Sequence, residues 1–485
     1  MHTNPQLSVH GDGGAQSEIY ALVAVPAVGV LLRNLFIPWI THGQRFASYG
    51  PTYWYKFLAD FVFIVAPIVA VLTLLSDSLR LVHITMISMA ALLLLFIVCE
   101  YSMVSKEGLV MRHVMNRLIE DQHEPTTFLT YFRSLVFLSV TVSILGVDFS
   151  IFPRRFAKTI TSGHSLMDTG VAAFIIASGI VKPLKTTSRR EETERRRARN
   201  RFSAFYSSTI LLVALGAART LVLWLLGYPY EVSEYGVHWN FFYTIAVVNL
   251  VSLLLPSQFT LIIATTVAAL HQIALSQGGL QEWVLDEKAP RVGLLEANRE
   301  GVCSLGGYIA LFCYARAMGR YISRTGMRLR AWSTCVVRLL FASLIFLCLQ
   351  YAAEFAVGAP SRRTVNLPYI FAMVSLFSFL VALCVAVQVV SFVLWAARFP
   401  HFGSDENPFA TSEPCLLTAV NRHALLFFLV SNVSTGVINM GVRAVTGLES
   451  TLLLPDAPSF LLLMLHSLSV CAIAHAMCAK RPKAQ

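Results

Sequence analysis

Long apolar runs, separated by short polar connectors, follow one another along most of the 485-residue chain. A helix that crosses the hydrocarbon core of a bilayer needs about 20 apolar residues, and thirteen runs come close to that length. The pattern therefore predicts an all-α, polytopic membrane protein with about 13 transmembrane helices. The predicted spans are 19–40, 54–75, 81–103, 127–147, 166–183, 204–226, 239–257, 259–275, 303–319, 333–352, 367–397, 420–444 and 456–478.

The connectors between these spans are too short to fold as separate domains. The chain is therefore expected to consist of a polar N-terminal tail, one multi-span membrane domain and a basic C-terminal tail, over residues 1–18, 19–478 and 479–485. The N-terminal tail lacks the basic segment of a cleaved signal peptide, so membrane insertion is expected to begin with the first span.

Composition agrees with a membrane protein and argues against a nucleic-acid partner. Apolar residues make up 56% of the chain and charged residues only 13%, whereas a soluble domain carries roughly a quarter charged residues. The net charge of +11 comes from a few short connectors that lack the interleaved aromatic residues typical of single-strand binding. The nine cysteines form no CxxC pair, so we expect them to be packing residues and predict neither a metal site nor a disulfide framework.

The distribution of Lys and Arg predicts the orientation in the membrane. Alternate connectors, together with the C-terminal tail, hold 21 basic residues, and the opposite set holds nine. Because basic connectors favour the cytosol, the N-terminal tail is expected in the lumen and the C-terminal tail in the cytosol. The run over 182–201, with nine of the 21, is then a cytosolic connector that contacts anionic lipid.

Most of the basic residues that break this rule fall in compact polar stretches on the lumenal side. These stretches are 148–158, 291–301 and 361–369, and a fourth at 234–242 adds an acid, a histidine and an asparagine. Charge at a membrane boundary has an energetic cost and usually a function. The stretches are therefore predicted to form one polar basin for an anionic lipid head group, with helix-end snorkelling and local ion pairs as the alternative.

Two pairs of adjacent arginines in these stretches are candidates for binding phosphate. Arg154–Arg155 and Arg362–Arg363 carry planar guanidinium groups, which match the geometry of phosphate oxygens. The pairs are therefore interpreted as a clamp for the phosphate of a lipid head group.

The first stretch also holds a candidate catalytic pair. Asp148 follows the fourth span and can act as a general base toward a hydroxyl, while Lys158 can stabilise oxyanion charge. Pro153 stops the helix, so the loop can fold back and bring the two together. His238 and Asp168 are reserve candidates for the base. No serine or cysteine lies in a nucleophile elbow, which favours direct transfer over an acyl-enzyme.

Several motifs resemble the glycosylphosphatidylinositol (GPI) inositol acyltransferases of the endoplasmic reticulum. The resemblance runs in order through "VDFSIFPRRFAKT…SLMDTGV", "EYGVHWNFF", "ANREG…SLGGY", "SRR…NLPY" and "NRHALLFFLVSNVSTGVINM". It implies a thirteen-span enzyme of the endoplasmic reticulum that moves an acyl chain, usually palmitoyl, from acyl-CoA to the 2-hydroxyl of inositol in glucosaminyl-phosphatidylinositol. This is an early step of GPI-anchor biosynthesis, and acyl-CoA is its co-substrate, with no bound cofactor.

The resemblance also assigns residues. The family's loop acid and loop lysine fall on Asp148 and Lys158, the expected catalytic pair. The N-terminal "GDGGAQSEI" matches the family's "NGxxxxEI" only loosely, with Asp12 where Asn is usual. The expected substrate-binding positions are Arg154, Arg155, Asp168, His238, Asn240, Asn298, Arg299, Glu300, Arg362, Arg363, Asn366, Asn432 and Asn439.

Three alternatives stay open from the residues alone. A lipid or metabolite transporter would have a similar number of spans, but it predicts ionisable groups within the membrane and internal repeats, and no repeat is visible. A non-catalytic scaffold would not need an acid and a lysine in one loop. The membrane-bound O-acyltransferases share the chemistry, but their intramembrane histidine is not evident here.

Overall fold

The structure is a computed structural model, and its described residues form helices and short connecting loops. Within them the only β-pairing is one isolated parallel bridge between Gly11 and Thr159, so the expected all-α class is confirmed. The described residues are 10–41, 51–104, 127–187, 194–226, 232–256, 258–286, 288–325, 329–398, 415–447 and 450–479.

The long helices coincide with the predicted spans, and several short helices lie in the predicted connectors. The long ones are α1 (Gln16–Thr41), α4 (Leu79–Val104), α6 (Thr127–Gly146), α7 (Gly170–Thr187), α8 (Glu194–Leu226), α10 (Phe241–Leu254), α11 (Thr260–Ser276), α15 (Leu305–Ser323), α16 (Leu329–Val357), α17 (Leu367–Arg398), α19 (Ala424–Thr446) and α20 (Asp456–Cys478). The short ones are α2 (Pro51–Asp60), α3 (Ala66–Val71), α9 (Val232–Tyr235), α12 (Leu280–Leu285), α13 (Leu294–Ala297), α14 (Arg299–Cys303) and α18 (Leu416–Arg422).

The described residues contain nine helical segments that are long and apolar enough to cross a membrane. The other four predicted spans fall on shorter apolar helices at Met167–Val181, Thr209–Leu225, Phe241–Leu254 and Thr260–Ser276. The protein is therefore a multi-pass membrane protein, and the count of thirteen crossings stays a prediction.

Two predicted spans are interrupted helices. The span predicted over 54–75 comprises α2, a π-helical turn (Phe61–Val65) and α3. Pro67 has no N–H to donate to the preceding turn, which explains the irregular hydrogen bonding just before it. The span predicted over 420–444 is broken at His423 into α18 and α19. Hydrophobicity therefore predicted the apolar segment but not the interruption of its helix.

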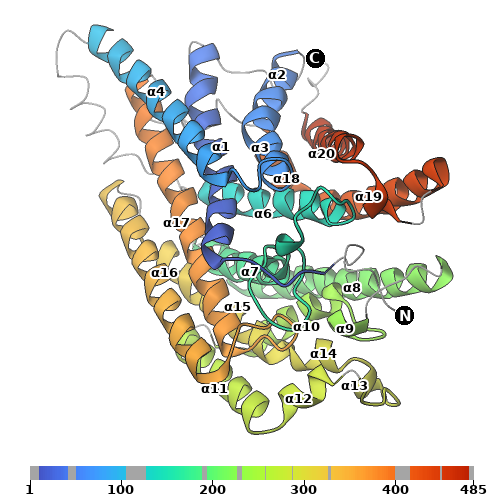
Figure 1. The fold of residues 1–485 in the computed structure, drawn as a ribbon. Coiled ribbons are helices and arrows are strands. Elements are labelled where there is room, and N and C mark those ends of the chain that lie inside the picture. Colours follow the sequence, from blue (N-terminus) through green and yellow to red (C-terminus); the bar gives the residue numbers. More distant parts are fainter. Residues whose placement is uncertain are drawn as a thin grey trace.

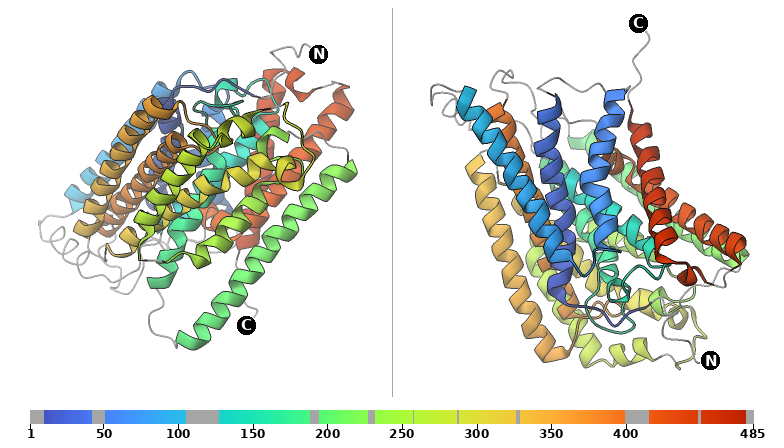
Figure 2. Two further views of the ribbon diagram at one scale, coloured as in Figure 1. Left: turned by 90° about the horizontal axis from the view of Figure 1, so that it is seen from below. Right: turned by 45° about the horizontal axis from the view of Figure 1, so that its top comes forward.

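In Figure 1, α6 and α7 lie near the centre of the bundle. On one flank α4, α17 and α16 lie side by side, and α19 and α20 lie on the opposite side (Figures 1 and 2). α17, α1 and α6 are the inner helices, with 78%, 67% and 61% of their most apolar stretch buried, compared with 17% for α4 and 22% for α16. The apolar surfaces of α4 and α16 are thus left to face lipid.

Candidate functional site

The loop after α6 folds back on itself, as expected from Pro153. Phe149, Phe152 and Phe156 are fully buried and anchor the loop to the bundle. Pro153 starts a short 3-10 turn, and the Arg154 guanidinium donates hydrogen bonds of 2.9 Å and 2.5 Å to the backbone carbonyls of Val147 and Phe149. Arg154 therefore holds the loop in its folded-back shape.

The candidate base, Asp148, is positioned by the C-terminal part of the chain. Asn439 of α19 donates a 2.7 Å hydrogen bond to its carboxylate, and the Thr451 hydroxyl donates a 2.8 Å bond to its backbone carbonyl. Burial raises the pKa of Asp148, while the Asn439 bond and the charges of Arg154 and Lys158 oppose this rise. A raised pKa suits a carboxylate that must accept a proton near neutral pH.

The candidate pair is not in direct contact. Within the part of the chain that the structure describes, no ion pair of 4.0 Å or less joins Asp148 to Lys158. Instead, the Lys158 ammonium donates to the carboxylate of Glu234 on α9. Lys158 acts on Asp148 only through its charge, which lowers the Asp148 pKa.

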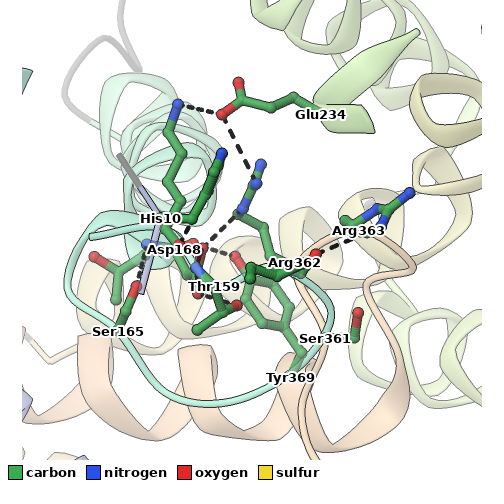
Figure 3. Close-up of polar contacts among 12 residues, drawn as sticks. His10, Thr159, Ser165, Asp168, Glu234, Ser361, Arg362, Arg363 and Tyr369 are labelled. Atoms are coloured by element: carbon green, nitrogen blue, oxygen red, sulfur yellow. Dashed lines mark hydrogen bonds and ion pairs between the residues drawn. The ribbon is translucent and has the colours of Figure 1, made fainter. Parts of the chain in front are cut away.

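Lys158 belongs to a ring of polar contacts that closes on itself (Figure 3). Glu234, which holds Lys158, lies 3.9 Å from the Arg362 guanidinium, and Arg362 donates a 2.8 Å bond to Asp168. Asp168 accepts a 2.7 Å bond from the Thr159 hydroxyl, and Thr159 is the neighbour of Lys158 in the chain. The ring therefore joins three of the four polar stretches.

Charges within the ring balance one another. Burial by itself raises the pKa of Glu234, but Lys158 and Arg362 outweigh this effect and bring it to about 2. Glu234 is thus ionised at any physiological pH. Asp168 and Arg362 are almost fully buried, and removal of one partner of such a pair costs about 3–5 kcal/mol because the other charge is left uncompensated.

The N-terminal tail crosses the same loop as a strap formed by residues 10–14. The Gly11 N–H donates a 3.1 Å bond to the Lys158 carbonyl, and the His10 ring lies 3.2 Å from that carbonyl. The Gly14 N–H bonds the His164 carbonyl at 2.8 Å. From the sequence, this segment was predicted only as a polar tail with a loose match to a family motif, although its glycines were a signal of close backbone approach.

A second ion cluster surrounds Glu300 in the 291–301 stretch. Arg291 binds the Glu300 carboxylate with two hydrogen bonds, of 3.1 Å and 2.5 Å, while Arg299 and Arg363 lie 3.7 Å and 3.9 Å from it. Arg299, which is fully buried, donates a further bond to the Asp286 carbonyl. Arg363 also approaches the Ile160 carbonyl, at 3.5 Å, so this cluster is tied to the ring.

Three candidate asparagines brace the backbone. Asn240 caps the start of α10, where its side-chain oxygen accepts a 3.0 Å hydrogen bond from the Phe242 N–H. Its side-chain amide also donates to the Gly216 carbonyl of α8. Asn298 accepts from the backbone N–H groups of residues 238 and 239. Asn366 accepts from the Ser361 N–H and donates to the Ala359 carbonyl.

Two further candidates lie apart from these networks. The His238 side chain is exposed, and only its backbone N–H is bound, by Asn298. Asn432 donates to the Phe428 carbonyl within its own helix. Neither contacts the ring around Lys158.

The four arginines expected to clamp phosphate already have protein partners. Arg154, Arg362 and Arg363 bind the loop backbone, Asp168 and the Glu300 cluster as described above. Arg155 binds Glu18 at 3.0 Å and the exposed Asp77 at 2.7 Å, and a third of its side chain is accessible. Arg155 is therefore the arginine of these four with the readiest access to a ligand.

A further charged cluster, which was not predicted from the sequence, lies within predicted spans. Arg33 of α1 and Asp60 of α2 form a fully buried ion pair at 2.5 Å. Asp60 also accepts a 2.8 Å bond from the Leu416 N–H, and Arg33 donates to Asn34. Hydropathy is averaged over a window of about 19 residues, so one charged residue in a span changes the average little. A buried pair with one member in each of two spans is therefore not visible in the hydropathy pattern.

Among the described residues, no three or more His, Cys, Asp or Glu side chains are grouped in a way that could hold a metal ion. The site consists instead of three side chains on the loop that follows α6: the partly buried Asp148 carboxylate, the partly exposed Lys158 ammonium held by an acid, and the accessible Arg155 guanidinium. A carboxylate can accept a proton, and the two cationic groups can bind a polar, anionic group.

Comparison with known proteins shows the family. The GWT1 family model matches residues 6–477. The mouse (Mus musculus) glucosaminyl-phosphatidylinositol-acyltransferase PIGW is 32% identical over 457 residues, covering 88% of this chain and 89% of that protein. The human (Homo sapiens) protein is 32% identical over 460 residues, covering 89% and 90%. The GPI-anchored wall transfer protein 1 of Schizosaccharomyces pombe is 34% identical over 356 residues, covering 71% of each chain. The chain belongs to the GWT1 family.

Proposed function

We propose that this chain is a GPI inositol acyltransferase. It moves a fatty acyl chain, palmitoyl by family resemblance, from acyl-CoA to the 2-hydroxyl of inositol in glucosaminyl-phosphatidylinositol. The observation that carries the proposal is the similarity over almost the whole chain to relatives named for that acceptor. The position of Asp148 and Lys158 on one anchored loop supports it.

Asp148 is the proposed general base. An inositol hydroxyl is a poor nucleophile, so its proton passes to the Asp148 carboxylate as the oxygen attacks the thioester carbonyl. The C–O bond forms, a tetrahedral oxyanion develops, and its collapse breaks the C–S bond and releases CoA as a thiolate. The Asn439 bond keeps one carboxylate oxygen fixed and leaves the other for the hydroxyl.

Lys158 is the proposed oxyanion partner. Its side chain is one-third exposed, and its ammonium has three N–H donors, of which Glu234 takes one. A positive donor aimed at the developing oxygen charge is worth about 10²–10³-fold in rate. Such transfer needs no bound cofactor, and acyl-CoA serves only as co-substrate.

Arg155 is the proposed ligand of the acceptor's phosphate. A phosphate at Arg155 would replace the contact with Asp77, whose side chain is 85% exposed and loses little by returning to water. The other candidate substrate-binding residues, His238 and Asn432 excepted, then act mainly by holding the loops in place around the head group.

We propose that the enzyme resides in the endoplasmic reticulum with its N-terminus in the lumen and its C-terminus in the cytosol. The excess of basic residues in one set of connectors supports this orientation. In sealed microsomes, a tag at residues 188–193 should be cut by added protease, whereas a tag at 227–231 should be protected. The reverse pattern would place the Asp148 loop in the cytosol.

A lipid or metabolite transporter is the second candidate. The buried Arg33–Asp60 pair supports it, because ionisable groups inside spans often mark a transport path. One experiment separates the two candidates: purified protein is incubated with labelled palmitoyl-CoA and glucosaminyl-phosphatidylinositol. Formation of inositol-acylated product supports the enzyme. Uptake of either substrate into proteoliposomes, with no acylated product, supports the transporter.

A further inference from the structure

Glu234 is the one carboxylate in contact with the Lys158 ammonium in the part of the chain that the structure describes. The two residues are 76 positions apart, Lys158 in the loop after α6 and Glu234 on the short helix α9. The Glu234 side chain is 17% exposed and that of Lys158 33%, so the pair lies at the edge of the buried ring. The acid faces inward, and the ammonium keeps a side open to solvent.

Glu234 is itself held from a second direction. The same carboxylate oxygen that accepts from Lys158 lies 3.9 Å from the Arg362 guanidinium. Arg362 is fixed in turn by Asp168, whose backbone carbonyl accepts a 2.6 Å bond from Tyr369. A carboxylate supported in this way has little freedom to follow a moving lysine.

A flexible lysine depends on such support. The four-carbon side chain of Lys loses rotamer entropy when it is fixed, and an unsupported ammonium spreads over many positions. A catalytic group that is displaced by ~1 Å can cost about 10²-fold in rate. Fixing one N–H donor of Lys158 before substrate binds should therefore raise the rate of acyl transfer.

We propose that Glu234 is a positioning residue for acyl transfer, holding one N–H of Lys158 so that the other donors face the thioester oxygen. The inference rests on the proposed function and adds a residue to it. Glu234 does not touch the substrate in this scheme. It acts through Lys158 alone.

A double-mutant cycle distinguishes this role from a structural one. Wild type, Glu234→Gln, Lys158→Met and the double variant are purified in detergent. The values of kcat and of KM for both substrates are measured with labelled acyl-CoA. Asp77→Asn is the matched control, because it also removes a carboxylate from an ion pair with this loop, but one whose side chain is 85% exposed.

We expect Glu234→Gln to lower kcat by up to about 10²-fold with KM nearly unchanged, and Asp77→Asn to keep the wild-type kcat. In the Lys158→Met background, Glu234→Gln should have no further effect, because the group it positions is gone. Glu234→Asp keeps the charge and should recover part of the rate. If Glu234→Gln gives no folded protein, the same cycle with Glu234→Asp decides.

Two results would overturn the inference. One is a wild-type kcat in Glu234→Gln. The other is a loss of kcat that is equally large with and without Lys158, which would indicate a structural role. If the wild-type protein forms no acylated product, the proposed function itself fails, and the inference fails with it.

Discussion

The side-chain amide of Asn439 donates a 2.7 Å hydrogen bond to the Asp148 carboxylate across 291 positions of the chain. Asp148 lies in the loop just after α6, whereas Asn439 lies on the buried face of α19 together with Ser431 and Thr435. The proposed base is therefore oriented by a helix from the far end of the sequence. Its geometry depends on how α19 packs against α6.

Asp148 and Lys158 are expected to carry the chemistry. Asp148→Asn keeps the shape and the Asn439 contact but removes the base, so turnover should fall by about 10²–10⁴-fold. Lys158→Met should cost about 10²–10³-fold. Both variants should keep their yield and their binding of acyl-CoA, measured by ligand-dependent thermal shift. Near-normal turnover in Asp148→Asn would remove the base assignment and make His238 the next candidate.

Asn439→Leu tests the hydrogen bond to Asp148 through the pH dependence of the rate. The Asn439 N–H stabilises the ionised carboxylate and so lowers the Asp148 pKa. Without it that pKa rises further, the base is protonated at a higher pH, and the acidic limb of the kcat profile should move to higher pH. The measurement is a pH–rate profile under saturating substrates.

Asn432→Leu is the control for this shift, because Asn432 is on the same helix but donates to its own backbone at the Phe428 carbonyl. Its acidic limb should coincide with that of the wild type, whatever happens to the rate. Equal shifts in both variants would mean that the limb reports a general change in α19 rather than the protonation of Asp148.

The sequence pattern predicted the helices well because hydrophobicity is a property of each segment alone. It also predicted which polar stretches gather, since span number and basic residues place connectors on one side. It did not predict that Lys158 pairs with Glu234 rather than Asp148. Such a partner depends on how loops far apart in sequence pack, and side-chain spacing within one loop contains no information on it.

The helix irregularities and the N-terminal strap were also not predicted, because residue type alone does not show them. The break at His423 and the π turn before Pro67 are local changes in hydrogen bonding within runs that stay apolar. The strap of residues 10–14 has a polar, glycine-rich sequence, which resembles that of an unstructured terminus. Its contacts are mostly backbone hydrogen bonds, and these leave little trace in residue type.

Breaking the Arg33–Asp60 pair should destabilise the helical bundle. Asp60→Asn leaves the fully buried Arg33 without its counter-charge, which typically costs about 3–5 kcal/mol. The thermal midpoint in detergent should fall clearly. Arg33→Met combined with Asp60→Asn removes the charge and keeps an oxygen for the Leu416 N–H, so the double variant should recover much of the loss. Equal midpoints for the single and the double variant would contradict this.

The strap of residues 10–14 should affect turnover without affecting the stability of the bundle. A Cβ at Gly11 would lie 1.9 Å from the Arg154 carbonyl oxygen, a contact that the backbone on both sides cannot relieve. Gly11→Ala should therefore lift the strap and remove the N–H that binds the Lys158 carbonyl. Because a catalytic group displaced by ~1 Å can cost about 10²-fold, kcat should fall by up to that factor while the thermal midpoint stays within error.

Gly14→Ala is the matched control on the same strap. Its Cβ would lie 3.3 Å from the Glu18 side-chain oxygen, and 3.5 Å and 3.7 Å from the Cβ and the carbonyl oxygen of Arg155. Only the glutamate contact is tight, and this flexible side chain can move by the few tenths of an ångström needed. Its kcat should stay near the wild-type value. Comparable losses in both variants would show that the tail tolerates no added side chain anywhere, and wild-type turnover in Gly11→Ala would show that the strap does not hold Lys158 in place.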